Sequence, residues 1–375
     1  MESTAGRWWA PGRVNLIGEH TDYNDGYVLP MALPLGVTCT AAAGPGGVVQ
    51  VRSRQAPGDS VDTTTAALGA GGWSEFPAWS RYPLGVIREF ERGGHEVSGV
   101  HLDLDGTVPI GAGLSSSAAL SCSVAIALRD LFAPTTTDTE LIDIARTAEN
   151  VYAGVPTGTL DQSASLLCIP GHLLFLDTRT GATEQIPFDL AAFGLTLLII
   201  DTGIPHRLVD SDYAARRAEC AAAAAQLGVP ALRDIPFAAE ADRLTDPLLR
   251  RRARHVITEN ARVLQIAEQL RTGADPRAIA PLLTAAHQSL RDDFEVSSPP
   301  LNIAVETALT AGAHGARMTG AGFGGSILAL TDRDDTPTIV TAIRESFATK
   351  GFPPPRDYTV APSAGAHRLP GPDVV

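Results

Sequence analysis

A short polar segment near the N-terminus carries the densest group of side chains able to do chemistry. Residues 13–30 read Arg-Val-Asn-Leu-Ile-Gly-Glu-His-Thr-Asp-Tyr-Asn-Asp-Gly-Tyr-Val-Leu-Pro. Glu19 and Asp22 are acceptors suited to the hydroxyl groups of a polyol, and His20 can donate or accept a hydrogen bond. Arg13 supplies a fixed positive charge. These types indicate either a polyol-binding site or a hydrogen-bonded turn.

The same segment superficially resembles a calcium-binding loop over residues 22–26. A calcium loop of the EF-hand type needs Gly at its sixth position and Glu at its twelfth. Here Gly26 falls one position early, and Leu33 stands where the Glu should be. Calcium binding is therefore excluded.

A loop rich in glycine and serine predicts an anion site. Residues 109–119 read Pro-Ile-Gly-Ala-Gly-Leu-Ser-Ser-Ser-Ala-Ala and lie between an expected strand and an apolar helix. The glycines let the backbone approach a ligand, and the free N–H groups and dipole of the helix N-terminus attract negative charge. The serines offer hydroxyls to phosphate oxygens or to a metal. The alternative is a serine-rich cap on an apolar helix.

A second glycine cluster, residues 319–325, matches the pattern G-x-G-x-x-G. The run that follows it, Ser-Ile-Leu-Ala-Leu, is typical of a strand rather than of the helix that a Rossmann fold requires. This cluster therefore predicts a turn beside a ligand or a tight hairpin.

Asp161 lies in a neighbourhood of small and apolar residues, within the segment 157–162. A carboxylate there must be paired or hydrogen-bonded. Next to an arginine in a pocket it would be a candidate base for a hydroxyl proton, whereas on a surface it would be a helix cap or a salt-bridge partner.

The composition restricts the possible chemistry. The chain has 29 basic and 42 acidic residues, a net charge of −13 and a pI near 5.1, which opposes nucleic-acid and anionic-membrane partners. Lys350 is its single lysine. A P-loop, a protein kinase and a pyridoxal-phosphate enzyme each need a lysine at a defined place, and position 350 fits none of them. Any phosphate group must be bound without lysine.

Two further observations concern metal binding and the cell compartment. The cysteines show no metal-ligand spacing and are interpreted as small buried hydrophobic residues; they are Cys39, Cys122, Cys168 and Cys220. The first residues lack an apolar signal core, and no apolar run is long enough to span a bilayer. We expect a soluble cytoplasmic protein.

The elements that must position these residues follow from periodicity and turn signals. In the first half we expect strands at 36–43, 48–54, 100–105, 173–177 and 195–201, and helices at 79–92, 114–131 and 138–152. Residues 55–72 are expected to form a loop or a sheet-edge segment.

From about residue 211 to 310 the pattern is almost entirely helical, with clear helices at 213–227 and 246–271. It then returns to strand, loop and strand at 316–330, a helix at 337–349 and a short strand near Tyr358. With 375 residues, two domains are expected, 1–190 and 191–375. The basic cluster Arg250, Arg251, Arg252 and Arg254 is interpreted as a solvated helix face.

Taken in chain order, these motifs resemble the galactokinase family of the GHMP small-molecule kinase superfamily. Residues 12–23 are similar to the galactokinase signature, 109–119 to the superfamily's phosphate loop, 157–162 to its catalytic-Asp segment and 317–325 to its third motif. Segments 211–217, 254–257 and 287–297 also resemble the family. The resemblance covers nearly the whole chain, and this superfamily binds ATP without a P-loop lysine.

The resemblance implies a two-domain α+β fold with the active site in the cleft between the domains. The N-terminal domain would be mixed α/β, of the kind found as the second domain of ribosomal protein S5, and the C-terminal domain would be ferredoxin-like. The implied reaction is transfer of the ATP γ-phosphate to the anomeric hydroxyl of α-D-galactose, assisted by Mg²⁺. ATP and galactose would be the partners of an expected monomer.

The resemblance also implies roles for individual residues. Asp161 would be the base or electrostatic orienter of the sugar O1, and Arg13 would keep it ionised and neutralise the transferring phosphate. The sugar would be bound by Glu19, His20, Asp22, the Gly158 backbone and Tyr213. The nucleotide phosphates would be cradled by Gly111, Ala112, Gly113, Leu114, Ser115, Ser116, Ser117, Ala118 and Ala119. Ser117 and Glu149 would contact Mg²⁺, and Trp79 and Tyr82 would stack near adenine or belong to the core.

Two departures from the family pattern are visible. The family commonly has Cys-Gly-Ile-Met-Asp-Gln where this chain has Thr-Gly-Thr-Leu-Asp-Gln at 157–162. Many relatives place a basic residue just before a histidine upstream of Tyr213, whereas here Pro205 precedes His206 and Arg207 follows it.

Other functions remain open at this point. They are a kinase of arabinose or N-acetylgalactosamine, a mevalonate kinase and a non-catalytic galactose sensor. The polar cluster of residues 19–22 argues against mevalonate, and the intact phosphate loop argues against a sensor.

Overall fold

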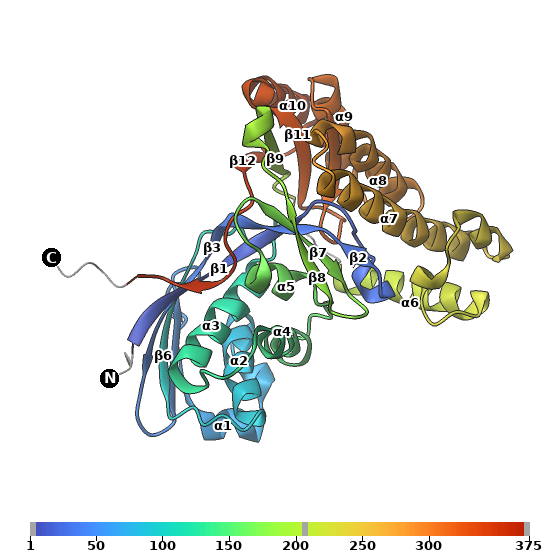
Figure 1. Cartoon of the computed structure of the whole chain (residues 1–375). Helices are drawn as coiled ribbons and strands as arrows, with labels where there is room; N and C mark the ends of the chain where they lie inside the picture. Colours follow the sequence, from blue (N-terminus) through green and yellow to red (C-terminus); the bar gives the residue numbers. More distant parts are fainter. Residues whose placement is uncertain (1–4, 205–208, 371–375) are drawn as a thin grey trace.

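The computed structural model describes residues 5–204 and 209–370, and this part of the chain contains three sheets (Figure 1). The largest sheet has the strand order β13-β1-β3-β6-β4-β5 and is antiparallel except between β4 and β6. Its strands are β1 (Ala5–Asn15), β3 (Pro30–Ala43), β4 (Val48–Ser53), β5 (Val61–Thr64), β6 (Val100–Gly106) and β13 (His367–Arg368).

Helices cover one face of this sheet, as the lower half of Figure 1 shows. Strand β6 alternates buried and exposed residues, so that Leu102 and Leu104 face the helices while Asp103 faces solvent. Ile87 and Leu128 pack against these leucines in one apolar cluster. The covering helices are α1 (Thr65–Ala70), α2 (Arg81–Arg92), α3 (Ser116–Phe132), α4 (Asp138–Thr147) and α5 (Leu160–Leu167).

The second sheet is antiparallel, with the order β10-β11-β9-β12. All seven residues of β9 are buried, because apolar clusters cover both faces of this sheet. Its strands are β9 (Leu195–Asp201), β10 (Gly315–Thr319), β11 (Ser326–Asp332) and β12 (Arg356–Val360). The helices of this half are α6 (Val209–Leu227), α7 (Pro247–Arg271), α8 (Ala280–Asp292), α9 (Pro299–Thr310) and α10 (Thr336–Lys350).

One apolar core joins the two halves of the molecule. Val14 and Met31 of the first sheet belong to the same cluster as Leu197 and Leu328 of the second sheet. A small third sheet, β2 (Tyr27–Val28), β7 (His172–Asp177) and β8 (Thr183–Pro187), lies between the halves in Figure 1. Strand β13 pairs with β1, so the end of the described chain returns to the first sheet. The domain boundary near residue 190 remains our proposal.

The expected elements are confirmed, with shifts of a few residues at their ends. Residues 44–47 separate two strands as expected, but β6 lies between those strands in the sheet, so the turn does not make a hairpin. The edge segment expected within 55–72 contains β5 and the short helix α1, which is capped by the Thr64 side chain. The helix expected over 138–152 continues beyond α4 as a π-helix, Ala148–Ala153.

The interpretation of the basic cluster 250–254 as a solvated face is wrong for Arg252. Its side chain is 2% exposed, and Nε donates to Glu219 Oε2 at 2.6 Å. Nη2 also lies 2.8 Å from Glu295 Oε2. Arg252 therefore ties α7 to α6 and to the segment after α8.

Two compositional expectations also meet the structure. The four cysteines are free and buried, which confirms their interpretation as small hydrophobic residues. Within residues 5–204 and 209–370, no helix is both long and apolar enough to cross a membrane.

Candidate active site

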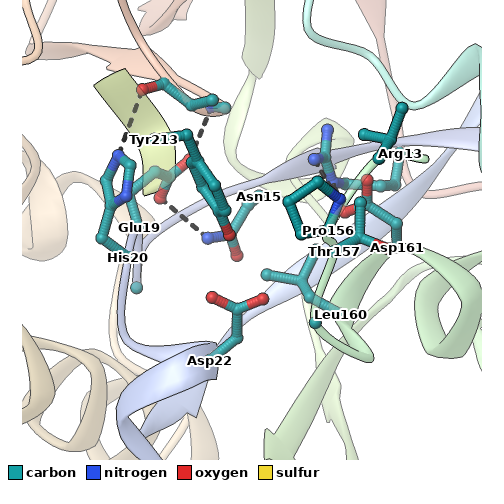
Figure 2. Close-up of a pocket in the computed structure, with 15 residues that line it drawn as sticks. Arg13, Asn15, Glu19, His20, Asp22, Pro156, Thr157, Leu160, Asp161 and Tyr213 are labelled. Atoms are coloured by element: carbon teal, nitrogen blue, oxygen red, sulfur yellow. Dashed lines mark hydrogen bonds and ion pairs between the residues drawn. The ribbon is translucent and has the colours of Figure 1, made fainter. Parts of the chain in front are cut away.

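A cavity of about 140 Å³ lies where the two halves meet, and it gathers the predicted sugar and catalytic residues (Figure 2). Arg13 comes from β1, Asp161 from the first turn of α5 and Tyr213 from α6. Figure 2 shows Arg13 and Asp161 on one side and Glu19, His20 and Tyr213 on the other. The lining residues are Arg13, Asn15, Gly18, Glu19, His20, Asp22, Val155, Pro156, Thr157, Gly158, Leu160, Asp161, Tyr213, Gly320 and Ala321.

Asp161 is held at both carboxylate oxygens. Arg13 donates from Nε to Oδ1 at 2.8 Å, and its Nη2 lies 2.7 Å from the same oxygen. Ser115 donates from Oγ to Oδ2 at 2.5 Å. The position of Asp161 in the first turn of α5 also suits a negative charge. Charge-assisted bonds on both oxygens fix the orientation of this carboxylate in the cavity.

The phosphate loop lies directly beside this pair. Arg13 Nη1 donates to the carbonyl oxygen of Gly113 at 2.7 Å, so one guanidinium binds both the loop and Asp161. The register of β1 against β3 shifts between Pro11 and Arg13, an irregularity that re-aims side chains. Ser115 adopts a left-handed conformation, φ 56° and ψ 48°, immediately before α3 begins. Such backbone strain in a non-glycine residue is concentrated at functional sites.

The residues of the phosphate loop differ in how far they are exposed. Gly111 is exposed, whereas four of the predicted cradle residues are buried, backbone included, with no more than 1% of their surface exposed: Ala112, Leu114, Ala118 and Ala119. The second glycine cluster is the turn of the β10–β11 hairpin, and its Gly320 lies against Gly113. The hairpin interpretation of that cluster is thereby confirmed. Because Gly320 also lines the cavity, the position of this turn beside a ligand stays a prediction.

The predicted metal contacts, Ser117 and Glu149, are neighbours. Ser117 donates to Glu149 Oε1 at 2.6 Å, and Gln162 Nε2 donates to Oε2 at 2.7 Å. Burial raises the pKa of Glu149 to about 7, although the Ser117 hydrogen bond lowers it. No group of three or more His, Cys, Asp or Glu among the described residues could hold a metal. Adjacent hydroxyl and carboxylate oxygens do fit Mg²⁺, which keeps waters and phosphate oxygens as its other ligands.

Asp22 faces the cavity and lies against Gly158. An ideal Cβ built on Gly158 would overlap Oδ2 of Asp22, so a side chain at that position would displace the Asp22 carboxylate. Burial, and after it the charge of Asp161 across the cavity, raise the pKa of Asp22 to about 6. Tyr213 lies near His20, with 5.7 Å between ring centroids, and burial raises the pKa of its hydroxyl well above the usual value.

The polar atoms of Glu19 are already bound within the protein. Oε1 accepts from Thr319 Oγ1 at 3.0 Å and from Gly320 N at 2.9 Å. Oε2 accepts from Asn15 Nδ2 at 2.7 Å and lies 2.5 Å from Arg317 Nη2. Glu19 therefore links the first half of the chain to the β10–β11 hairpin while it lines the cavity. Burial raises its pKa, and Arg317 opposes that rise.

His20 is similarly engaged. Its Nε2 lies 3.2 Å from the Ala321 carbonyl oxygen, and its Nδ1 lies 2.9 Å from the Tyr23 hydroxyl. A carbonyl can only accept, so the proton is assigned to Nε2 and Nδ1 accepts from Tyr23. Burial, and after it the nearby His255, lower the pKa of His20 to about 3. The ring is therefore neutral at pH 7.

Sequence reasoning missed two asparagines. Asn15 lies two residues after Arg13 on β1, and the period of two for a strand face could have found it. Asn150, on the π-helix, accepts from Thr157 N at 2.7 Å and donates to the Thr157 carbonyl at 3.2 Å. No local signal indicated that contact. Asn150 fixes the segment that carries Gly158.

Trp79 packs against the apolar cluster between the largest sheet and its covering helices. Its Nε1 is a buried donor without an acceptor in the described part of the chain. This leaves both interpretations of Trp79, core and adenine neighbour, open. Pro205, His206 and Arg207, where the sequence departs from the family pattern, lie outside the described residues.

The fold and the phosphate loop define the class. Models described as "GHMP kinases N terminal domain" and "GHMP kinases C terminal" match residues 81–168 and 266–349. The structure of a mevalonate kinase from Methanococcus jannaschii is similar in fold, with a TM-score of 0.67 over 96% of this chain and 99% of that chain at 16% identity. The expected two-domain α+β fold of the GHMP kinases is thereby confirmed.

More specific matches define the family. The galactokinase galactose-binding signature matches residues 2–43. A galactokinase from Streptomyces coelicolor is 47% identical over 368 residues, covering 97% of this chain and 94% of the relative. The structure of a Lactococcus lactis galactokinase complexed with galactose has a TM-score of 0.91 and 32% identity, covering 98% and 96%. The chain belongs to the galactokinase family.

Proposed function

We propose that this protein transfers the γ-phosphoryl group of ATP to the anomeric hydroxyl of α-D-galactose, giving galactose 1-phosphate and ADP. The observation that carries the proposal is the position of Asp161 in the cavity. Arg13 and Ser115 both bind its carboxylate. Ser115 is part of the phosphate loop, and Arg13 binds the loop at the Gly113 carbonyl oxygen. The sugar hydroxyl and the phosphoryl donor would therefore meet at this carboxylate.

In this mechanism Asp161 accepts or orients the proton of the sugar O1 while O1 forms its bond to the γ-phosphorus. The bond from that phosphorus to the bridging oxygen of ADP breaks, and the proton ends on the carboxylate. Arg13 neutralises charge that develops on the transferred group. Ser115 keeps one carboxylate oxygen occupied and so presents the remaining lone pairs to the sugar.

The sugar contacts are proposed for Asp22, the Gly158 backbone, Tyr213, Glu19 and His20. Asp22 and Tyr213 support this most directly, because both line the cavity. Neither the Asp22 carboxylate nor the Tyr213 hydroxyl forms a hydrogen bond to another side chain among the described residues. Glu19 and His20 would contribute mainly by shaping the cavity wall, since their polar atoms already have protein partners.

The nucleotide is proposed to lie on residues 111–119. The open backbone at Gly111, the left-handed Gly113 and the N-terminus of α3 together offer N–H groups and a positive helix dipole to phosphate oxygens. Trp79, whose indole N–H is buried without an acceptor among the described residues, is proposed to lie beside the base.

Ser117 and Glu149 would hold Mg²⁺, with Gln162 orienting the Glu149 carboxylate. When bound, the cation would neutralise the phosphate oxygens of ATP. A monomer stays our proposal for the working unit. The cytoplasmic location expected from the sequence stays a prediction.

The test is ATP-dependent phosphate transfer measured across galactose, glucose, arabinose and N-acetylgalactosamine. A site that binds a hydroxyl strongly rejects a sugar in which that hydroxyl is misplaced, because its own acceptor is left unpaired. We expect kcat/KM for galactose to exceed that for glucose by at least about 100-fold. Equal kcat/KM for the two sugars would contradict the proposal.

A further inference from the structure

Helix α7 carries three buried polar residues close together in its sequence, although none of them lines the cavity. His255 and Glu259 are fully buried, and Asn260 is 7% exposed. His255 and Glu259 stand at positions i and i+4 and share a face of the helix, and Asn260 lies on the side next to that face. Buried polar groups persist only where they make specific hydrogen bonds.

All three bind the backbone of one loop, residues 18–27, which lies more than 230 positions away in the sequence. The Gly18 N–H donates to Glu259 Oε1 at 3.0 Å, and the Tyr27 N–H donates to Asn260 Oδ1 at 2.9 Å. His255 Nε2 lies 3.1 Å from the Glu19 carbonyl oxygen, to which it donates. The contacts lie on both sides of Asp22, so they fix the two ends of the loop that presents its carboxylate.

The loop is pressed closely against the helix. An ideal Cβ at Gly26 would overlap Oδ1 of Asn260, so a side chain at that position would separate the two elements. The amide nitrogen of Asn260 is buried without an acceptor among the described residues. Among the described residues, Asn260 therefore binds the loop through its side-chain oxygen, which accepts from the Tyr27 N–H.

Charges around Glu259 keep it an acceptor. Burial would raise its pKa, but Arg262 and Arg317 hold it at about 2. Arg262 Nη2 lies 2.8 Å from Oε2, while Oε1 is the oxygen that receives the Gly18 N–H. The carboxylate therefore binds the loop with a full negative charge at neutral pH.

We propose that His255, Glu259 and Asn260 are positioning residues that hold loop 18–27 in the conformation that presents Asp22 to galactose. The inference rests on the proposed function, which places the sugar against this loop. It adds that affinity for the sugar depends on a helix that touches neither substrate.

The test compares Asn260→Ala, Asn260→Asp and the matched control Thr258→Ala. Asn260→Ala removes the acceptor for the Tyr27 N–H, whereas Asn260→Asp keeps it. Thr258 is on the same helix, but its hydroxyl bonds only to the helix's own carbonyls, those of Arg254 and His255. The readouts are the Kd for galactose, the Kd for ATP and hydrogen exchange over residues 18–29 without sugar.

We expect Asn260→Ala to raise the galactose Kd about tenfold and to speed exchange across the loop. The ATP Kd should stay within about twofold, because the nucleotide site does not touch α7. Asn260→Asp should bring the galactose Kd back to within about threefold of wild type. Thr258→Ala should match wild type in all three measurements.

Several results would overturn the inference. They are unchanged exchange in Asn260→Ala, an equal rise in both Kd values, or an Asn260→Asp protein as weak as Asn260→Ala. If Asn260→Ala does not bind ATP and so is not folded, Asn260→Ser carries the same readouts with a side chain too short to reach Tyr27. A wild-type protein that does not bind galactose would instead refute the proposed function, while the exchange data would still show whether α7 holds the loop.

Discussion

The carboxylate of Asp22 occupies the space that a side chain at Gly158 would need. An ideal Cβ at residue 158 would overlap Oδ2 of Asp22, and both residues line the same cavity. The two residues belong to segments separated by more than 130 positions in the sequence. Loop 18–27 and the segment before α5 must therefore pack against each other to form the cavity.

Gly158→Ala is expected to weaken galactose binding strongly. Overpacking costs about 1–3 kcal/mol, so the galactose Kd should rise about tenfold or more while the ATP Kd is kept. Calorimetry with each ligand separately measures this. Gly69→Ala is the matched control, because a Cβ there meets only ordinary contact distances in α1. If the clash is the cause, adding Gly158→Ala to Asp22→Ala should weaken galactose binding little further; a full additional loss would contradict it.

Asp161→Asn should fold and bind both substrates but turn over slowly. Its amide can keep the Arg13 bond at Oδ1, and the Ser115 hydroxyl can accept where it formerly donated. Loss of the base should lower kcat by ~10²–10⁴-fold, measured as initial rates at saturating galactose and ATP. A kcat within a few-fold of wild type would leave positioning as the whole catalytic effect.

Arg13→Ala should also slow turnover, and its loss should not multiply with that of Asp161→Asn. The two side chains act as one hydrogen-bonded unit, so the double variant should be nearly as active as the slower single variant. A double-mutant cycle on kcat tests this. Fully multiplicative losses would show that Arg13 acts on the phosphate independently of Asp161.

Gly113→Val should lower ATP affinity. Gly113 has φ +75°, a region that costs a β-branched residue about 1–2 kcal/mol, and it belongs to the proposed phosphate loop. Gly351→Val controls for the strain alone, since Gly351 has φ +72° with open space around it at the end of α10. Nucleotide titration should separate the two variants. Equal ATP affinity would remove the loop from the nucleotide site.

Galactose affinity should fall below about pH 6. The pKa of Asp22 is raised to about 6 by burial and then by Asp161, and a sugar hydroxyl donates a stronger hydrogen bond to the ionised carboxylate than to the protonated acid. Galactose therefore favours the deprotonated form, and its affinity should be constant above about pH 7 and fall by up to about tenfold per pH unit below 6. Calorimetry from pH 5 to 8 without nucleotide measures this. Asp22→Asn should bind weakly with no such dependence, and a flat wild-type profile would contradict the proposed contact.

The sequence alone determined most local structure and the chemical identity of the site. The strands and helices were readable because burial on one face imposes a period of two or of 3.6, as in β6 with Leu102 and Leu104 buried around Asp103. The phosphate loop was readable because glycines, serines and the helix they precede are adjacent in the chain. Arg13, Asp22 and Asp161 were identified by their types within short motifs.

Only the tertiary structure decided which distant groups meet. The insertion of β6 between β3 and β4, the Ser115 bond to Asp161 and the burial of Arg252 all depend on partners far along the chain. Local spacing carries no information about such pairs, because each side chain alone is compatible with solvent or with a partner. The buried polar residues of α7 are the clearest case. In the sequence they are polar positions of a helix, and only the packing of the two halves shows that they bind loop 18–27.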